Sequence, residues 1–370
     1  MAVALALAGV IHSGRSADGQ PAGLATLPRY YVALTFTGPG GCCEAGLVSP
    51  QTSAVVRATA TGRALAAVVP PLPYGTFVGV SAAADDRTFV LAAQELSRYS
   101  PANDGKPPVP ATKFFLLRLD PGRSGPGVRA TLTPLPIPVI PDGTAVSDFA
   151  LSPDGSRLAM VAGRAYVRRS YLQNLSVYNL AAGTHRSYRP AGVGYPYVGG
   201  VPDPVPITPN TLSWGADNRT LAFVWREWTG SGGVRLLDTA QPGSGLLANS
   251  RVAIPWSRTT FWTQIQLGAD GREIFANVAN TSKGGDYEHL AEFSAQTGKL
   301  VRTFNVIRDM AVDVEQIHWI SPSGRVLIVT DERRGRHHSP AHYADVDAGI
   351  LSGGHYTPLP WSENTFTAAW

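Results

Sequence analysis

The chain has 370 residues, of which 44% are hydrophobic and 16% are charged, so it has enough apolar material for a large core and too little charge for a disordered protein. Its formal net charge of +4 is small for this length. No long run of Lys and Arg is interleaved with aromatic residues, which argues against nucleic acid as a partner.

The N-terminal segment, residues 1–23, begins with the apolar run MAVALALAGVI and continues with small and polar residues. Eleven apolar residues are too few to span a bilayer, which needs about 20. The run resembles the hydrophobic region of a signal peptide but lacks the basic residues that precede one. Two interpretations remain: the remnant of a signal or membrane anchor, or a loosely packed arm. We expect residues 24–370 to form a single domain.

The two cysteines, Cys42 and Cys43, are adjacent, and the chain contains no CxxC motif. Neighbouring cysteines rarely form a disulfide because the ring is strained, and zinc sites made of cysteine need spaced pairs. The sequence therefore predicts neither a disulfide framework nor a cofactor.

A strand, a tight turn containing Asp or Asn, and a second alternating strand recur along the chain. The five copies are SAAADDRTFVLAA (81–93), LSPDGSRLAM (151–160), WGADNRTLAFVW (214–225), LGADGREIFANV (267–278) and ISPSGRVLIVT (320–330). Asp and Asn favour such turns because their side chains bond to the nearby backbone. Third strands are expected at 113–120, 174–180, 234–239 and 289–294. Four strands per repeat is the pattern of a β-propeller blade.

The last residues, TFTAAW (365–370), read as a strand that matches the first strand of a blade. At the other end, residues 28–37, 52–58 and 62–69 read as the second to fourth strands of a blade that lacks its first. We therefore expect the C-terminal strand to complete blade 1 and close the ring, which removes exposed sheet edges. This arrangement gives an all-β, six-bladed β-propeller. Seven blades would require one long loop to hold a further blade.

The SPDG-type turns resemble those of TolB-like and WD40-like β-propellers, although the Trp-Asp and Gly-His signatures of WD40 repeats are absent. The layout is also similar to extracytoplasmic propeller proteins of high-GC Gram-positive bacteria, many of which follow a membrane segment. The resemblance covers most of residues 28–370 and implies a propeller that works outside the cytoplasm. It implies no particular activity.

One face of the predicted propeller carries short turns, and the other carries long loops. Length added to one face is typical of a scaffold that presents a binding surface. Aromatic residues and arginines are common anchors of such surfaces. The residues that we expect to bind a partner are Tyr166, Arg168, Arg169, Tyr195, Tyr197, Arg226, Trp228, Trp262, Arg333 and Arg334.

Polar residues are also expected at the long-loop end of the central channel, among them Asp313, Glu315, His318 and Glu363. They could form a lyase-type or hydrolase-type site, a small-ligand sensor or a Ca²⁺ site, since carboxylates serve as acids, bases and ligands. Alternatively, they line a hydrated channel. His337, His338 and His342 could bind a metal, but Pro340 prevents a helical arrangement and no carboxylate is placed beside them.

The sequence thus predicts a monomeric, extracytoplasmic recognition scaffold without enzymatic activity, secreted or held by an N-terminal anchor that this chain lacks. Its partner would be a protein or a cell-envelope component, bound on the long-loop face. No GxSxG elbow, P-loop or dinucleotide-binding motif is present. A propeller enzyme or ligand sensor that uses the channel carboxylates is the alternative.

Overall fold

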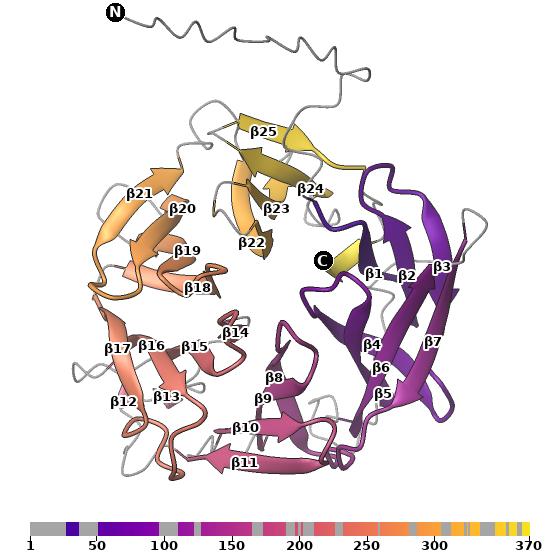
Figure 1. The fold of residues 1–370 in the computed structure, drawn as a ribbon, viewed down its shortest axis with the longest axis horizontal. Coiled ribbons are helices and arrows are strands. Elements are labelled where there is room, and N and C mark those ends of the chain that lie inside the picture. The colour runs from indigo at the N-terminus through magenta and orange to yellow at the C-terminus, as the bar shows by residue number, and fades with distance from the viewer. Residues whose placement is uncertain are drawn as a thin grey trace, which may run out of the picture.

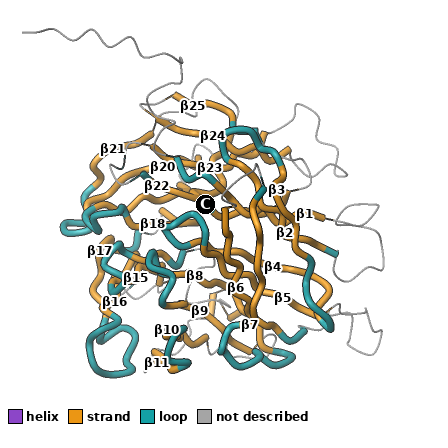
Figure 2. The backbone as a smooth tube through the Cα atoms, turned by 45° about the vertical axis from the view of Figure 1, so that its right-hand side comes forward, coloured by secondary structure: helices purple, strands orange, loops and turns teal. Residues whose placement is uncertain are grey.

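The computed structural model describes most of the chain after the N-terminal segment. The described residues are 27–36, 51–95, 110–121, 127–164, 173–189, 197–198, 201–202, 211–225, 232–257, 260–280, 287–304, 312–321, 324, 326–333, 345–352, 355–360 and 365–370. All regular secondary structure within these ranges is β-strand (Figure 2).

Six four-stranded antiparallel sheets surround a central axis and form a six-bladed β-propeller (Figure 1). The blades, written from the axis outwards, are β26-β1-β2-β3, β4-β5-β6-β7, β8-β9-β10-β11, β14-β15-β16-β17, β18-β19-β20-β21 and β22-β23-β24-β25. We number them blades 1 to 6 in this order. The predicted fold class is therefore confirmed, with six blades rather than seven.

Each strand position in the blade recurs around the ring. The first strands are β26 (Thr365–Ala369), β4 (Tyr74–Ala82), β8 (Thr144–Leu151), β14 (Ser213–Trp214), β18 (Thr260–Leu267) and β22 (Val312–Ile320). The second strands are β1 (Tyr30–Phe36), β5 (Thr88–Glu95), β9 (Arg157–Arg164), β15 (Thr220–Trp225), β19 (Glu273–Asn280) and β23 (Val326–Arg333).

The outer half of each blade is equally regular. The third strands are β2 (Thr52–Ala58), β6 (Thr112–Pro121), β10 (Gln173–Asn179), β16 (Gly233–Asp238), β20 (Tyr287–Ser294) and β24 (Asp345–Ser352). The fourth strands are β3 (Ala64–Val68), β7 (Val128–Pro134), β11 (Thr184–Tyr188), β17 (Ser250–Pro255), β21 (Leu300–Phe304) and β25 (His355–Pro358). A separate two-stranded hairpin joins β12 (Tyr197–Val198) to β13 (Val201–Pro202).

The turns between first and second strands are built around the expected aspartates. In blade 2, Asp85 Oδ1 accepts hydrogen bonds from the backbone N–H of Arg87 at 3.0 Å and of Thr88 at 2.8 Å. Asp217 accepts the equivalent pair in blade 4. The carboxylate thus satisfies two donors that the tight turn would otherwise leave unpaired.

The two ends of the described chain meet in blade 1. Strand β26 pairs antiparallel with β1, with Val32 opposite Ala369 and Ala33 opposite Ala368. The C-terminus consequently lies beside β1, near the axis (Figure 1). This pairing confirms the predicted closure of the ring.

Hydrophobic clusters fill the spaces between neighbouring blades. Between blades 3 and 4, for example, the fully buried Tyr188, Phe223 and Trp225 pack together with Trp214. Alternating residues of one strand therefore face different neighbours, because successive side chains point to opposite faces of the sheet.

Three of the first strands, β4, β8 and β18, share a bulge near their midpoint. Pairing with the second strand is interrupted at Val78 in β4, Ser147 in β8 and Thr263 in β18, each seven residues before the turn aspartate. A bulge bends the strand and increases its local twist. Its repetition places equivalent residues at equivalent depths in the channel.

One turn on the short-turn face is longer than expected. The connection between β16 and β17 spans residues 239–249 and lies against blade 3, where Arg189 N–H donates to Ser244 O at 2.8 Å and Leu246 N–H donates to Arg189 O at 3.0 Å. Leu246 is fully buried in the cluster between blades 3 and 4. The Gly-rich residues 243–245 are therefore part of the contact between blades.

Candidate functional site

A cavity of about 300 Å³ occupies the turn-side half of the central channel, and all six blades line it. Its rim includes the small residues that directly precede the turns, namely Ala84, Pro153, Ala216 and Ala269. The cavity therefore lies toward the short-turn face, whereas the sequence interpretation placed the channel site at the long-loop end.

Two of the described residues that line this cavity are ionisable, Asp148 and His318. The other polar side chains in the lining are serine, threonine and glutamine, together with the indole groups of tryptophan. The chemistry of the cavity thus depends on what these two residues contact.

Asp148 joins blade 3 to blade 4. Its Oδ2 accepts hydrogen bonds from the backbone N–H of Thr211 at 2.8 Å and of Leu212 at 2.9 Å. Part of the side chain borders the cavity, but the surrounding protein desolvates the carboxyl group. This burial raises the pKa of Asp148 to about 6, although the backbone hydrogen bonds act to lower it. Asp148 Oδ2 is therefore engaged in the contact between blades 3 and 4.

His318 joins blade 6 to blade 1. The imidazole hydrogen-bonds to the backbone of Ala368, and its ring centroid lies 5.2 Å from that of Trp370. Burial lowers the pKa of His318 to about 4, so the ring is neutral near pH 7. A neutral imidazole with a backbone partner is poorly placed to act as a general acid.

Polar side chains make similar links at the other junctions. Leu151 N–H donates to Ser81 Oγ at 2.9 Å, and Leu267 N–H donates to Ser213 Oγ at 2.9 Å. Gln264 bridges blades 5 and 6, because its Nε2 donates to Ile317 O at 3.0 Å while its Oε1 accepts from Ile317 N–H.

Blades 1 and 2 are joined in the same way from a third strand. Phe77 N–H donates to Thr52 Oγ1 at 2.7 Å, and Thr52 Oγ1 donates to Phe77 O at 2.8 Å. One edge of each first strand faces the axis and has no strand to pair with. Side chains from neighbouring blades satisfy backbone groups along this edge, where an unpaired group would cost free energy.

These links alternate between two positions around the ring. Ser81 and Ser213, in blades 2 and 4, each stand four residues before the turn aspartate and bond to a leucine N–H of the next blade. Asp148 and Gln264, in blades 3 and 5, each stand six residues before the turn aspartate. Their bonds to the next blade therefore lie farther from the short-turn face than those of the serines. The sequence analysis missed the two serines, although their shared spacing was a detectable signal.

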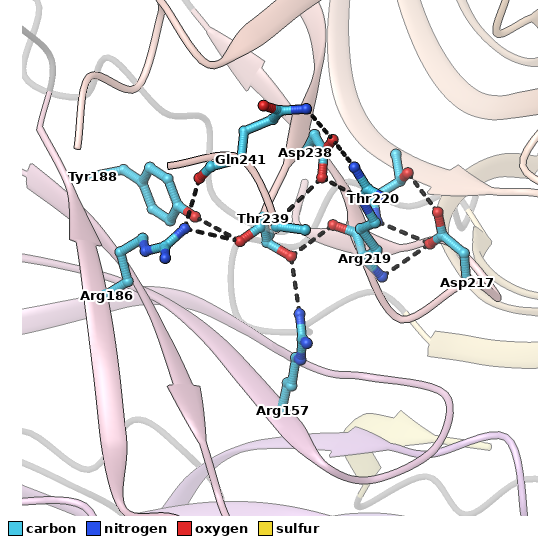
Figure 3. A network of polar contacts seen from close by, with 10 residues as sticks. Arg157, Arg186, Tyr188, Asp217, Arg219, Thr220, Asp238, Thr239 and Gln241 are labelled. Carbon is cyan, nitrogen blue, oxygen red and sulfur yellow. Dashed lines mark hydrogen bonds and ion pairs between the residues drawn. The ribbon is translucent and has the colours of Figure 1, made fainter. Parts of the chain in front are cut away.

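A second polar network joins blades 3 and 4 on the short-turn face (Figure 3). Thr239 Oγ1 donates to Arg219 O at 2.7 Å and accepts from Arg157 Nη1 at 3.1 Å, while Arg186 Nη1 donates to Thr239 O at 3.2 Å. Arg219 also makes a bidentate ion pair with Asp238, which holds the pKa of that carboxyl group well below its usual range. The guanidinium groups of Arg157 and Arg186 thus link blade 3 to blade 4, whereas that of Arg219 bonds within blade 4.

Among the residues expected to bind a partner, Trp262 is the one whose side chain the structure describes. Trp262 is only 4% exposed, and it packs in the cluster between blades 4 and 5 with its ring centroid 5.7 Å from that of Trp256. Its large apolar ring is used in the core, so the expectation of a surface contact is corrected. Tyr197 lies on β12 and Arg333 ends β23, and their side chains are outside the described part.

Most of the remaining predicted site residues cannot be placed. Asp313 and Glu315 lie on β22, but their side chains are not described. The residues outside the described ranges are Tyr166, Arg168, Arg169, Tyr195, Arg226, Trp228, Arg334, His337, His338, His342 and Glu363.

Within the described ranges, no three His, Cys, Asp or Glu residues are grouped so that they could hold a metal ion. The same ranges hold no helix of the length and apolarity that crossing a membrane requires.

No protein-family model matches the chain, and no curated protein matches it. Solved structures do resemble it. It is similar to the β-propeller domain of the trilobed protease from Pyrococcus furiosus, with 11% identity, coverage of 78% of this chain and 72% of that one, and a TM-score of 0.40. It is also similar to a prolyl endopeptidase, with 12% identity, coverage of 90% of this chain and 51% of that one, and a TM-score of 0.44.

A third similar structure is Sqt1 from Chaetomium thermophilum, solved bound to the N-terminus of ribosomal protein L10. Here the identity is 13%, the coverage is 83% of this chain and 68% of that one, and the TM-score is 0.39. The chain spans about half the length of the prolyl endopeptidase. Identities this low concern the fold alone, and the fold that they have in common with this chain is the β-propeller.

Proposed function

We propose that the protein is a non-enzymatic propeller scaffold that holds a protein or cell-envelope partner on its long-loop face. The observation that carries the proposal is the exposure of large apolar side chains on stiff linkers between blades. The contacts of the two ionisable residues in the cavity support it, because Asp148 Oδ2 bonds to Thr211 and Leu212 of the next blade and His318 bonds to Ala368 of the next blade.

The linker between blades 1 and 2 presents two apolar side chains to solvent. Val69 is 70% exposed and Leu72 is 94% exposed. Pro70, Pro71 and Pro73 surround them, and Tyr74 N–H donates to Pro71 O at 2.9 Å to close a turn. Since the ring of proline fixes φ, the linker loses little conformational entropy when a partner binds.

The linker between blades 2 and 3 has the same character. Lys113 Nζ donates to Leu135 O at 3.1 Å and to Ile137 O at 2.7 Å, and Ile140 exchanges two backbone hydrogen bonds with Thr112. Val139 nevertheless remains 46% exposed. Blade-to-blade linkers lie at the long-loop end of a propeller, so both linkers contribute to the proposed surface.

The test is capture of partners from the cell envelope of the source organism by the purified protein. We expect a reproducible set of partners that is lost with Leu72→Asp combined with Val139→Asp. The matched control is Leu300→Asp combined with Val301→Asp, because these residues are 56% and 57% exposed on β21, an outer strand away from the linkers. Equal capture by both double variants would contradict the proposal.

The proposal includes a location outside the cytoplasm. The apolar run at residues 2–11 and the resemblance of the turns to TolB-like propellers support it. Proteolysis of intact cells tests this location, since an extracytoplasmic propeller is cleaved or released while a cytoplasmic marker stays intact.

A further inference from the structure

The central cavity is large enough to hold a small molecule. Its volume of about 300 Å³ lies at the lower end of the range for small-molecule sites, which is about 300–1,000 Å³. All six blades line it, and its rim residues Ala84 and Ala216 are exposed on the short-turn face. The cavity is therefore open to solvent from this face.

Hydroxyl groups in the wall of the cavity have hydrogen-bonding capacity that the protein does not use. Ser81 Oγ accepts from Leu151 N–H and Ser213 Oγ accepts from Leu267 N–H, each at 2.9 Å. A hydroxyl group that accepts one hydrogen bond still has a proton to donate. Among the described residues, no acceptor takes the hydroxyl proton of either serine, and both serines line the cavity. Blades 2 and 4 thus each provide a donor for a bound molecule.

Blades 1 and 5 add further polar groups to the wall. Gln266 Nε2 donates to Ile317 O at 2.9 Å, which fixes the amide group and leaves its Oε1 as an acceptor. Thr367 lines the cavity with a hydroxyl group that can both donate and accept. The described part of the chain supplies no hydrogen-bond partner for Gln266 Oε1 or for the Thr367 hydroxyl group. The wall therefore contains donors and acceptors for the hydroxyl groups of a ligand.

Tryptophan side chains provide apolar surfaces beside these polar groups. Trp214, Trp319 and Trp370 all line the cavity. The indole N–H of Trp214 donates to Ala150 O at 2.9 Å, and Trp370 stacks on Tyr31, so two of the rings are held in place before a ligand arrives. The face of an aromatic ring carries negative partial charge, which favours contact with C–H groups. Aromatic faces next to hydroxyl and amide groups suit a ring that carries both C–H and O–H groups.

The charges at the cavity wall disfavour ionic ligands. The ionisable side chains among the described lining residues are Asp148 and His318, and these lining residues include no Lys or Arg. An anion would therefore be buried beside a carboxyl group and without a cation, which costs free energy. Asp148 Oδ2 already accepts from the N–H groups of Thr211 and Leu212, which reduces its attraction for a cation. A neutral, polar molecule matches the wall best.

We propose that the central cavity is a binding site for a small neutral sugar of one ring. Its hydroxyl groups exchange hydrogen bonds with Ser81, Ser213, Gln266 and Thr367, while a C–H face of the ring packs on an indole group of the wall. This site goes beyond the proposed scaffold function, because it lies inside the ring and uses none of the linker residues on the long-loop face.

Isothermal titration calorimetry of the full chain tests the site with glucose, galactose, mannose and N-acetylglucosamine, each added alone. We expect at least one of these neutral sugars to bind saturably. Glucosamine and glucose 6-phosphate, which carry a charge, should bind at least about tenfold more weakly than that sugar. If none of the four neutral sugars binds at about 10 mM, or if the charged compounds bind as tightly, the proposal is overturned.

A matched pair of variants shows where the sugar binds. Ala216→Trp places a large side chain on the rim of the cavity and should abolish binding. Ala182→Trp places the same side chain on the exposed turn between β10 and β11, outside the cavity lining, and should leave the affinity unchanged. Equal affinity of the two variants would mean that the sugar is bound elsewhere and would refute the site.

Two further variants test the polar contacts. Ser213→Ala and Thr367→Val should each weaken binding by about tenfold, the value of one hydrogen bond. Ser213→Ala also removes the acceptor of Leu267 N–H, whereas Thr367→Val keeps the shape of the side chain and should leave the Tm of the unliganded protein unchanged. Native affinity in both variants would contradict the proposal. Leu72→Asp combined with Val139→Asp should bind the sugar normally, so this test is independent of partner capture.

Discussion

The indole ring of Trp370 stacks on the phenol ring of Tyr31, with ring centroids 4.7 Å apart and an angle of 17° between the planes. Tyr31 belongs to β1, and its hydroxyl group donates to Pro360 O at 3.2 Å, in the connection from blade 6. Trp370 therefore secures the closing strand β26 to blade 1 and to the last blade at once.

This stack predicts a strong effect of small changes at the C-terminus. Trp370→Ala should lower the free energy of unfolding by about 3–5 kcal/mol, because Trp370 is 4% exposed and its removal leaves a cavity. Deletion of residues 365–370 should be worse, since it also removes the strand paired with β1. Chemical denaturation measures both, with Val301→Ala at an exposed site as the control. A deletion that melts like the full chain would disprove the closure.

Substitutions of Asp148 should show whether the contact between blades 3 and 4 requires a hydrogen-bond acceptor or a negative charge. Asp148→Asn keeps an oxygen for the N–H groups of Thr211 and Leu212, whereas Asp148→Leu removes this acceptor, at a cost of about 1–3 kcal/mol for each hydrogen bond. Because burial raises the pKa of Asp148 from 3.8 to about 6, the native protein should lose stability relative to Asp148→Asn as the pH rises through this interval. Urea denaturation at pH 4 and pH 7 checks both expectations. An Asn variant as unstable as the Leu variant at both pH values would contradict the role of Asp148 as an acceptor between the blades.

His318 should make the propeller sensitive to acid. Burial lowers the pKa of His318 from 6.5 to about 4, so the unfolded chain binds the proton first and stability falls as the pH drops through this interval. The loss should be on the order of 2 kcal/mol, and it should be absent in His318→Gln, whose amide group can still bond to Ala368. Denaturation midpoints between pH 7 and pH 4 provide the measurement. If both proteins weaken equally, another group causes the acid sensitivity.

Two glycines with the same backbone conformation should respond differently to a methyl group. Gly298 has φ of +68° and Gly271 has φ of +70°. A Cβ on Gly298 would lie 2.3 Å from Ala253 O of the neighbouring blade, whereas a Cβ on Gly271 would meet no atom within 4 Å. Gly271→Ala should cost about 1–2 kcal/mol for the left-handed conformation alone. Gly298→Ala should cost on the order of 3 kcal/mol or more, because β17 must also move. Equal costs would mean that blades 4 and 5 adapt without strain.

The sequence predicted the architecture well because blade structure is local. The turn residues Asp85, Asp154, Asp217 and Asp270 bond to neighbours two or three positions away, and alternating strands follow them directly. The closure by residues 365–370 was also predictable, because a blade without a first strand had to find one.

The channel was harder to predict because its contacts join residues far apart in sequence. The bonds of Asp148 to Thr211 and Leu212, for example, depend on how two blades lie side by side. Trp262 shows the same limit, since residue type alone does not separate a surface anchor from a core residue that packs on Trp256.

The alternation of links around the channel restricts which blades can be neighbours. Ser81 of blade 2 and Ser213 of blade 4 each accept from a leucine N–H of the next blade, close to the turns. Asp148 of blade 3 and Gln264 of blade 5 each bond to the next blade farther from the turns. Blades 3 and 5 are nevertheless not interchangeable, because Gln264 donates to Ile317 O as well as accepting from its N–H, whereas the carboxylate of Asp148 only accepts. Recombination or design of this ring therefore has to match the donors and acceptors of each junction, since the edge of blade 4 needs an acceptor and the edge of blade 6 needs a side chain that both donates and accepts.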